Sequence, residues 1–246
     1  MSSIEWTEQT WNPVTGCTKV SPGCKHCYAE TMAKRLQAMG TPGYENGFST
    51  VTLIPERLEQ PLRRKKPTIY FVNSMSDLFH EKVTDDFLDQ VLDVMARCPQ
   101  HTFQVLTKRA ERLPIYFANR EVPPNVWLGV SVEDKKYGLP RIAHLQKVKC
   151  ETRFLSVEPL LEDLGGRIPL AGIAWCIVGG ESGHKARPMQ EAWVLSIKEH
   201  CERKGVSFFF KQWGVWGPDE IKRSKKANGR QLKGRTWDDI PVIELN

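Results

Sequence analysis

The chain lacks the long apolar run of a membrane span, since no stretch approaches about 18 consecutive apolar residues. Residues 1–6 also lack the basic region and apolar stretch of a signal peptide. We therefore expect a cytoplasmic protein without a membrane partner. Low-complexity segments and residue-level repeats are missing too. Among 246 residues, 40% are apolar and 26% are charged, a balance that is typical of globular chains with a sizeable core.

Two nucleotide-binding motifs are absent, because no Gly-x-Gly-x-x-Gly follows the first predicted strand and no phosphate loop occurs. Six short apolar segments predict strands: Thr68–Val72, Thr102–Leu106, Val126–Val132, Arg153–Val157, Ile173–Val178 and Ser207–Phe210. Their starts lie 20 to 34 residues apart, which fits a strand, a helix and two loops. This rhythm predicts an α/β fold, either a partial or complete (βα) barrel of about six βα units or an open doubly wound sheet. We favour the barrel over residues 1–213, with an irregular basic extension over residues 214–246 packed on it.

The segments between these strands predict amphipathic helices. Thr84 is a candidate N-cap, because two aspartates and a periodic apolar face follow it. Gly40 and Gly205 are expected to end two further helices. The stretches Arg109–Ala118 and Lys135–Lys147 show weaker helical patterns. Residues 40–59 are expected to form a loop insertion.

Polar residues follow every predicted strand, and in parallel α/β folds the site forms at the carboxyl ends of the strands. These segments are Asn73–Asp77, Thr107–Arg109, Ser131–Glu133, Glu158–Pro159, Gly179–Gly183 and Lys211–Trp213. Each one taken singly is explained as well by the polarity of ordinary loops. Six in a row with charges of both signs would suit a small zwitterionic ligand. Gly179 and Gly180 would let a ligand approach the backbone, although a tight turn explains them almost as well.

Three of the seven cysteines are clustered within the segment 16–28, as Cys17, Cys24 and Cys27 with the spacing C-x6-C-x2-C. An odd number of cysteines cannot pair completely, and clustered thiols in a chain without a secretion signal indicate a metal or redox site. With a fourth ligand such as His26, the site would be structural zinc. With three thiolates only, a [4Fe–4S] cluster would keep one iron free to bind a small molecule. Free thiols or a disulfide are the third possibility.

The three cysteines follow a short extended stretch at Trp11–Thr15. A three-cysteine loop after the first strand of a partial barrel resembles the radical S-adenosylmethionine superfamily. The chain is also similar to a family of phage and prophage proteins with a three-cysteine motif. That likeness rests on segments spread almost from end to end: Trp11–Cys17, Ser21–Cys24, Cys27–Glu30, Asn73–Phe79, Leu106–Arg109, Ser156–Leu160, Gly179–Gly183, Ala186–Met189 and Phe209–Gly214. The superfamily resemblance implies an enzyme in which a [4Fe–4S] cluster reductively cleaves S-adenosylmethionine to a 5′-deoxyadenosyl radical, with an external reductant as partner.

The resemblance also implies roles for individual residues. Cys17, Cys24 and Cys27 would be the cluster ligands. His26 would lie beside the adenine, and Gly179, Gly180 and Glu181 resemble the Gly-Gly-Glu that holds the methionine amino group. In the superfamily the first cysteine gap is three residues rather than six, and the Gly-Gly-Glu follows the second strand rather than a late one. Ser76 or Asp77 could therefore take the amino group instead, and Ser131 and Glu133 could meet ribose hydroxyls.

The substrate side of the site is expected to carry Asp77, Lys108, Glu158 and Lys211 as catalytic residues, together with Arg109. The net charge of +6 is uneven, with +5 between residues 219 and 235 and a second basic run at residues 63–66. A nucleic acid or nucleotide is therefore the expected substrate, in phage-related modification or repair. Trp213, Trp216 and Trp237 could stack on bases, or they could simply pin the extension to the barrel.

Two other functions are compatible with the sequence. A zinc-stapled nucleic-acid-binding protein without catalysis would use the same thiols. Metal-dependent hydrolysis would use Asp77, Glu158 and Glu181 with His80 or His184, but these histidines show no paired ligand spacing.

Overall fold

The computed structural model describes residues 4–183 and 185–241, and this part of the chain divides into two compact units. The first unit comprises Met1–Val20, Cys27–Gly129 and Lys147–Thr152. The second comprises Ser21–His26, Val130–Gln146 and Arg153–Asn246. The candidate ligand His184 lies outside the described residues.

The main sheet has seven strands in the order β1-β4-β5-β6-β7-β8-β9. Their bounds are Gln9–Trp11, Ile69–Val72, Thr102–Thr107, Val126–Ser131, Thr152–Val157, Trp175–Gly179 and Ser207–Gln212. The pairs β1·β4, β4·β5, β7·β8 and β8·β9 are all parallel. The predicted α/β partial barrel is therefore confirmed, and each of the six predicted strands is present. The extended stretch expected at Trp11–Thr15 covers the end of β1 and all of β2 (Val14–Thr15), which are short strands of three and two residues.

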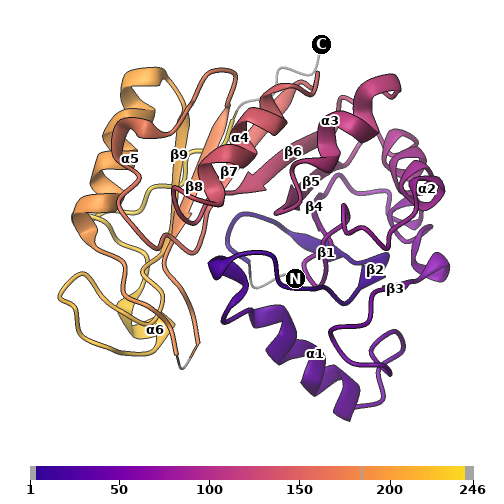
Figure 1. Ribbon diagram of the computed structural model, residues 1–246, viewed down its shortest axis with the longest axis horizontal. Coiled ribbons are helices and arrows are strands. Elements are labelled where there is room, and N and C mark those ends of the chain that lie inside the picture. The colour runs from indigo at the N-terminus through magenta and orange to yellow at the C-terminus, as the bar shows by residue number, and fades with distance from the viewer. Residues whose placement is uncertain (1–3, 184, 242–246) are drawn as a thin grey trace. The chain divides into compact units, whose positions relative to one another are not determined.

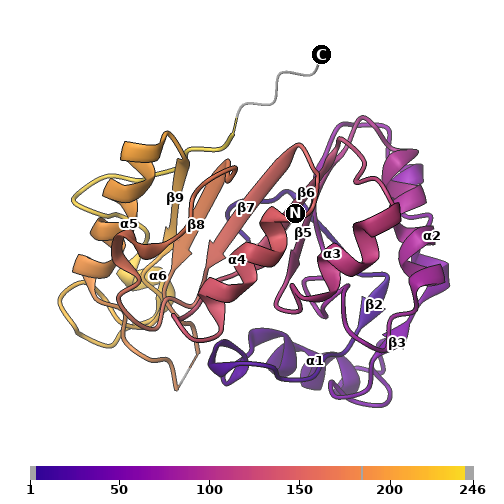
Figure 2. The ribbon, with the colours of Figure 1, turned by 45° about the horizontal axis from the view of Figure 1, so that its top comes forward.

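In the first unit, α2 (Asp85–Ala96) and α3 (Arg112–Tyr116) lie on the same side of β4 and β5 (Figures 1 and 2). Helix α1 (Tyr28–Ala38) instead buries Ala29 and Ala33 against Tyr44 and Met75. The expected loop at residues 40–59 contains strand β3 (Thr52–Leu53), which pairs antiparallel with β2 (Val14–Thr15). Three short 3-10 helices complete the unit, at Pro55–Arg57, Pro61–Arg63 and Phe117–Asn119.

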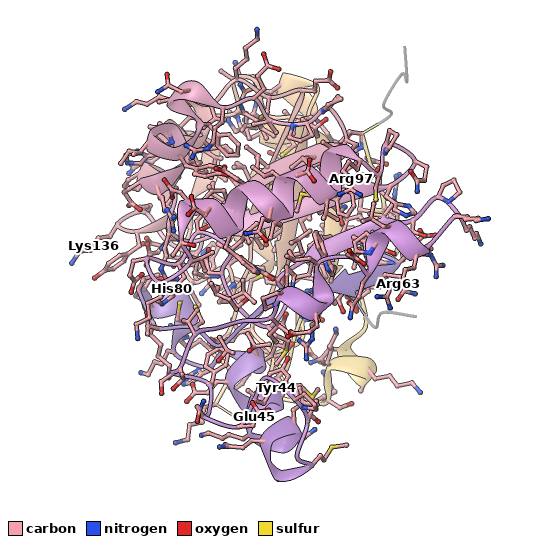
Figure 3. All side chains as sticks on the ribbon, turned by 90° about the vertical axis from the view of Figure 1, so that its right-hand side faces the viewer. Tyr44, Glu45, Arg63, His80, Arg97 and Lys136 are labelled. Carbon is pink, nitrogen blue, oxygen red and sulfur yellow. The ribbon has the colours of Figure 1, made fainter. Side chains whose placement is uncertain are left out.

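Helix α2 forms where its capping residue and apolar spacing predict it. The Thr84 side chain accepts a hydrogen bond from the backbone N–H of Phe87, and Asp85 and Asp86 occupy the first turn, where negative charge is favourable. The apolar face is buried from Phe87 to Met95. Figure 3 shows Arg97 at the C-terminal end of α2 and His80 toward the opposite end of the helix.

In the second unit, α5 (Glu191–Lys204) lies alongside β8 and β9 (Figure 1), and Gly205 ends it in the left-handed conformation with a φ of 67°. Helix α4 (Gly138–Gln146) follows β6, whereas only the 3-10 helix Gly165–Arg167 follows β7. The second unit also contains the 3-10 turn Pro22–Cys24 and the short helix α6 (Lys225–Asn228).

The C-terminal extension is held to strand β9. Asp238 forms an antiparallel bridge with Phe209, and the backbone N–H of Phe210 donates to the carbonyl of Trp237 at 2.9 Å. The Trp175 indole N–H donates to the carbonyl of Asp239 at 2.7 Å. No helix among residues 4–183 and 185–241 is long and apolar enough to cross a membrane.

Replacement of the α2 cap tests this account of the first unit. We expect Thr84→Ala to lower the free energy of unfolding by about 1 kcal/mol, because an N–H at the start of the helix loses its acceptor. Urea unfolding followed by circular dichroism measures the change. Thr31→Ala, on the exposed face of α1, is the control and is expected to change stability by less than about 0.5 kcal/mol. Equal effects of the two substitutions would contradict the capping role.

Candidate functional site

Asp77 organises the carboxyl ends of β4 and β5 in the first unit. Its carboxylate accepts hydrogen bonds from the Thr107 hydroxyl at 2.7 Å and from the backbone N–H groups of Phe79 and Lys108 at 3.0 Å. The Arg109 guanidinium adds a fourth donor at 3.3 Å. With only 6% of the residue exposed, Asp77 is an anchor for the polar loop after β5.

Arg109 connects this anchor to the first cysteine. Its Nη1 lies 3.3 Å from Asp77 Oδ2 and 3.5 Å from Cys17 Sγ, while its Nε donates to Glu81 at 3.1 Å. Its Nη2 donates to the carbonyl and the hydroxyl of Thr18. Burial acts to lower the pKa of Arg109, but Asp77, Cys17 and Glu81 outweigh it and the pKa is raised. A permanent cation therefore faces Cys17.

His80 supports the same loop as a neutral side chain. It is fully buried, and burial, followed by the nearby Arg109 charge, lowers its pKa. The backbone N–H of Lys82 donates to Nδ1 at 3.1 Å, which assigns the ring proton to Nε2. Nε2 then donates to the Thr18 hydroxyl at 2.9 Å. His80 and Arg109 thus both hold Thr18, the residue directly after Cys17.

In the second unit, Glu158 and Lys211 form an ion pair. Lys211 Nζ lies 3.0 and 2.9 Å from the two carboxylate oxygens. Gln212 Nε2 donates to Glu158 Oε1 at 3.2 Å and also to Ser182. The side chains of Glu158 and Lys211 are 19% and 14% exposed, so an anionic and a cationic group lie side by side within reach of a ligand.

Glu181 binds Arg187 and His26 rather than standing free. Arg187 donates from its side chain to both carboxylate oxygens and from its backbone N–H at 2.8 Å, and His26 Nδ1 lies 3.2 Å away. Burial acts to raise the pKa of Glu181, but these hydrogen bonds outweigh it and the pKa is lowered. Arg187 also donates to the carbonyl of Pro22 at 2.9 Å. The pair therefore holds the segment that carries Cys24.

Glu133 holds the same segment from the end of β6. Its carboxylate accepts hydrogen bonds from the Ser21 hydroxyl and, at 2.6 Å, from Arg141, and the residue is fully buried. A Cβ at Gly23 would lie 3.1 Å from the Glu133 carboxyl group, so the glycine permits this contact. Ser131 contributes its carbonyl, which accepts from Arg141 at 2.8 Å.

The two glycines after β8 allow parts of the chain itself to approach. A Cβ at Gly180 would lie 1.9 Å from the carbonyl oxygen of Trp213, and one at Gly179 would lie 3.3 Å from the Glu158 carboxyl group. The backbone N–H of Val215 donates to the carbonyl of Glu181 at 3.1 Å. Residues 213–215 thus pack directly against the Gly-Gly-Glu segment.

The three clustered cysteines are partly buried, and none of them forms a disulfide with another described residue. Cys17 and Cys27 belong to the first unit and Cys24 to the second. Cys27 directly precedes α1, and Cys24 Sγ lies 3.9 Å from the Ser21 hydroxyl. Within the described ranges, no three His, Cys, Asp or Glu side chains are gathered as they would be around a bound metal ion.

The structure brings several predicted site residues into contact, and it adds partners that the sequence analysis did not assign. Asp77 meets Lys108 through the backbone of Lys108, and Glu158 meets Lys211 and Gly179. The hydroxyl of Ser76 donates to the carbonyl of Val14. The added partners are Arg141 and Arg187. The spacing Glu181-x5-Arg187 and the opposite charges of the two residues were the only local signals for that pair.

Comparison with known proteins assigns the sequence to a family and finds solved structures with a similar fold. A family model described as "Protein of unknown function (DUF5131)" matches residues 1–241. No curated protein matches the chain. A solved cysteine-to-serine mutant of spore photoproduct lyase is similar, with a TM-score of 0.50 and 14% identity, over 73% of this chain and 57% of that one. The lyase complexed with dinucleoside spore photoproduct has a TM-score of 0.46 and 13% identity, over 77% and 59%. This chain thus spans less than two thirds of the lyase, and the likeness is one of fold.

Replacement of Gly180 tests the close packing behind the site. We expect Gly180→Ala to lower the free energy of unfolding by about 3 kcal/mol, because the new methyl group would overlap the Trp213 carbonyl oxygen. Gly166→Ala is the matched control, since its methyl group would meet nothing closer than 4.0 Å. Thermal unfolding measures both variants. A Gly180→Ala protein as stable as the control would show that residues 213–215 do not pack as described.

The Glu181–Arg187 pair predicts a specific pH dependence. Because folding lowers the pKa of Glu181 below its ordinary value of 4.5, its ionised form stabilises the protein above that pH. This stability is lost as the pH falls through the lowered pKa. We expect Arg187→Gln to cost about 3 kcal/mol at neutral pH and to flatten the acid limb below pH 4.5, since it leaves a buried carboxylate without its cation.

Urea unfolding at pH values from 7 to 3 measures this dependence. The control is Arg203→Gln, at the exposed end of α5. Parallel curves for the wild type and the Arg187 variant at all pH values would contradict the pairing.

Proposed function

The chain belongs to the DUF5131 family of unknown function, and we propose that it is a radical S-adenosylmethionine-type enzyme that acts on a nucleic acid or nucleotide. One observation carries this proposal. Three cysteines that form no disulfide among the described residues lie within eleven residues of a partial (βα) barrel, and the polar ends of its strands hold the segments around them. A phage-related modification or repair reaction is the proposed setting.

The chemistry of the donor set fits an iron–sulfur cluster. Cys17, Cys24 and Cys27 would supply three soft thiolate ligands, and three ligands leave one iron of a [4Fe–4S] cluster without a protein ligand. His26, the fourth ligand that zinc would need, has its Nδ1 3.2 Å from Glu181, so only its Nε2 is left for a metal ion. The neighbouring positions of His26 and Cys27 also make joint binding to one ion awkward. When bound, the cluster supplies the electron that cleaves S-adenosylmethionine, and an external reductant replaces that electron.

The residues of the chain would position this group rather than react. Arg109 donates to Cys17 Sγ, and its own orientation is fixed by Asp77. Arg187 and Glu133 hold Pro22 and Ser21, the first two residues of the segment Ser21–Cys24. We therefore assign Glu181 to the support of the Cys24 segment, in place of the amino-group contact that the Gly-Gly-Glu resemblance implies.

Glu158 and Lys211 are the best placed residues to meet a ligand. Their charges are opposite, their side chains are partly exposed, and Gln212 fixes the carboxylate. A carboxylate and an ammonium side by side complement a ligand with both signs of charge, such as the methionine part of S-adenosylmethionine. In the first unit, Lys108 stays a proposed catalytic residue, and its backbone N–H donates to Asp77.

The proposed substrate class rests on charge and on fold likeness. The net charge of +6 favours an anionic partner. Spore photoproduct lyase, whose name states that it acts on a photoproduct, shares the fold over 73% of this chain. Both features support a nucleotide or nucleic acid as the substrate and repair or modification as the reaction.

Anaerobic reconstitution with iron and sulfide tests the proposal. We expect brown protein with about four irons per chain that forms 5′-deoxyadenosine from S-adenosylmethionine and a reductant. Serine substitution of Cys17, Cys24 or Cys27 is expected to abolish both iron retention and product, because one ligand is lost. Cys150→Ser, at a partly buried cysteine outside the cluster motif, is the matched control and is expected to keep both.

Two results would overturn the proposal. Colourless protein with one zinc per chain would favour the nucleic-acid-binding alternative. A fully loaded cluster that never cleaves S-adenosylmethionine would remove the radical chemistry.

A further inference from the structure

We propose that residues 222–235, the basic tail, bind the phosphate backbone of a polynucleotide by charge and not by base stacking. This inference rests on the proposed function and narrows its substrate from a nucleotide to a polynucleotide. The basic tail contains seven Lys and Arg residues and no acidic residue. Arg223, Arg230 and Lys233 pair with the carboxylates of Asp219, Asp238 and Glu191, which lie outside the tail. Lys222 and Lys226 are exposed and place positive charge where a polyanion can reach it.

The tryptophans of the C-terminal extension serve as anchors within the protein. Trp213 is 1% exposed, and its indole N–H donates to the carbonyl of Gln231 at 2.8 Å. Lys198 and Arg235 both lie over the Trp237 ring, at 4.2 and 3.7 Å from its centroid. Trp216 donates its indole N–H to the carbonyl of Ala186 at 2.7 Å. The expectation that Trp213 stacks on bases is therefore wrong, because the ring is buried. Two cations lie over the Trp237 ring, where a stacked base would compete with them.

Within the second unit, the basic tail is tied by hydrogen bonds to the segment that holds Cys24. The backbone N–H of Arg223 donates to the carbonyl of Val215 at 2.9 Å, and Val215 donates to the carbonyl of Glu181 at 3.1 Å. Asn228 donates from its side chain to the carbonyl of Val215 at 2.8 Å. Glu181 in turn contacts His26 and Arg187. A polynucleotide on the basic tail would therefore lie next to the proposed site.

The composition of the basic tail favours nucleic acid over an anionic membrane. Binding to a membrane surface needs an apolar face beside the charges. Ile221 and Ile240 are the only exposed large apolar side chains among the described residues of the extension, and both lie outside the basic tail. Closely spaced cations without an apolar stripe match the regular charges of a phosphate backbone.

The test compares two variants that each remove three positive charges. The first replaces Lys222, Lys225 and Lys226 of the basic tail with Gln. The second, as a matched control, makes the same replacement at Arg63, Lys65 and Lys66 of the other basic run, in the first unit. Fluorescence anisotropy measures binding of a labelled DNA duplex, a DNA strand and an RNA strand over a range of salt concentrations. Vesicles that contain anionic lipid form a separate arm.

We expect the wild type to bind the nucleic acids with an affinity that falls steeply with salt. The tail variant is expected to bind at least tenfold more weakly at low salt, with a slope of log K against log salt that is smaller by about two to three. The control is expected to keep the wild-type slope. Equal losses in both variants, a slope that the tail substitutions leave unchanged, or tighter binding to vesicles than to nucleic acid would overturn the inference.

The same variants separate this inference from the proposed function. Cleavage of S-adenosylmethionine in the absence of nucleic acid does not involve the basic tail, so the tail variant is expected to form 5′-deoxyadenosine at the wild-type rate. If S-adenosylmethionine is cleaved but the tail variant binds nucleic acid as tightly as the wild type, the proposed role of the basic tail is rejected and the proposed enzyme activity stands. If S-adenosylmethionine is not cleaved but the tail variant loses binding as expected, the proposed enzyme activity is rejected and the role of the basic tail stands.

Discussion

Buried carboxylates need cationic partners, and this requirement organises the polar ends of the strands. Asp77, Glu133 and Glu181 are each at most 6% exposed, and each is paired with an arginine from its own unit. An unpaired charge at such positions would cost several kcal/mol, so the partners are as necessary as the carboxylates. Arg109 and Arg187 then use their remaining donors on the segments around the cysteines. Two of the arginines that the buried carboxylates require thus also fix the positions of the segments around the cysteines.

This arrangement divides the charged residues into two groups. The first group consists of the buried carboxylates that are paired with arginines. Two of these arginines, Arg109 and Arg187, also donate to Cys17 and to the carbonyl of Pro22. Glu158 and Lys211 remain partly exposed and offer both signs of charge to a ligand. The proposed enzyme therefore separates support of the cluster from contact with the substrate. The match of the family model over residues 1–241 includes the cysteines, the strand ends and the basic tail, so the whole arrangement falls within DUF5131.

The sequence predicts the strands well because their apolar runs are local signals. It predicts β1 only by its last residue and misses β3, because these strands have three and two residues and depend on pairing with distant segments. It also predicts which polar residues follow the strands, but not the partners of those residues. Arg187 lies six residues from Glu181, yet its contact with Pro22 spans 165 positions, and no local pattern encodes such a distance. Trp213 looks like an exposed aromatic residue in the sequence and is buried, because Gly180 lets its backbone approach.

The most direct test of the account is the electron paramagnetic resonance spectrum of the reconstituted, chemically reduced protein, recorded before and after addition of S-adenosylmethionine. Three thiolate ligands and one open iron predict a reduced [4Fe–4S] signal whose g values change when the sulfonium compound binds. A signal that is the same with and without S-adenosylmethionine, or a protein with no cluster signal at all, would contradict the account.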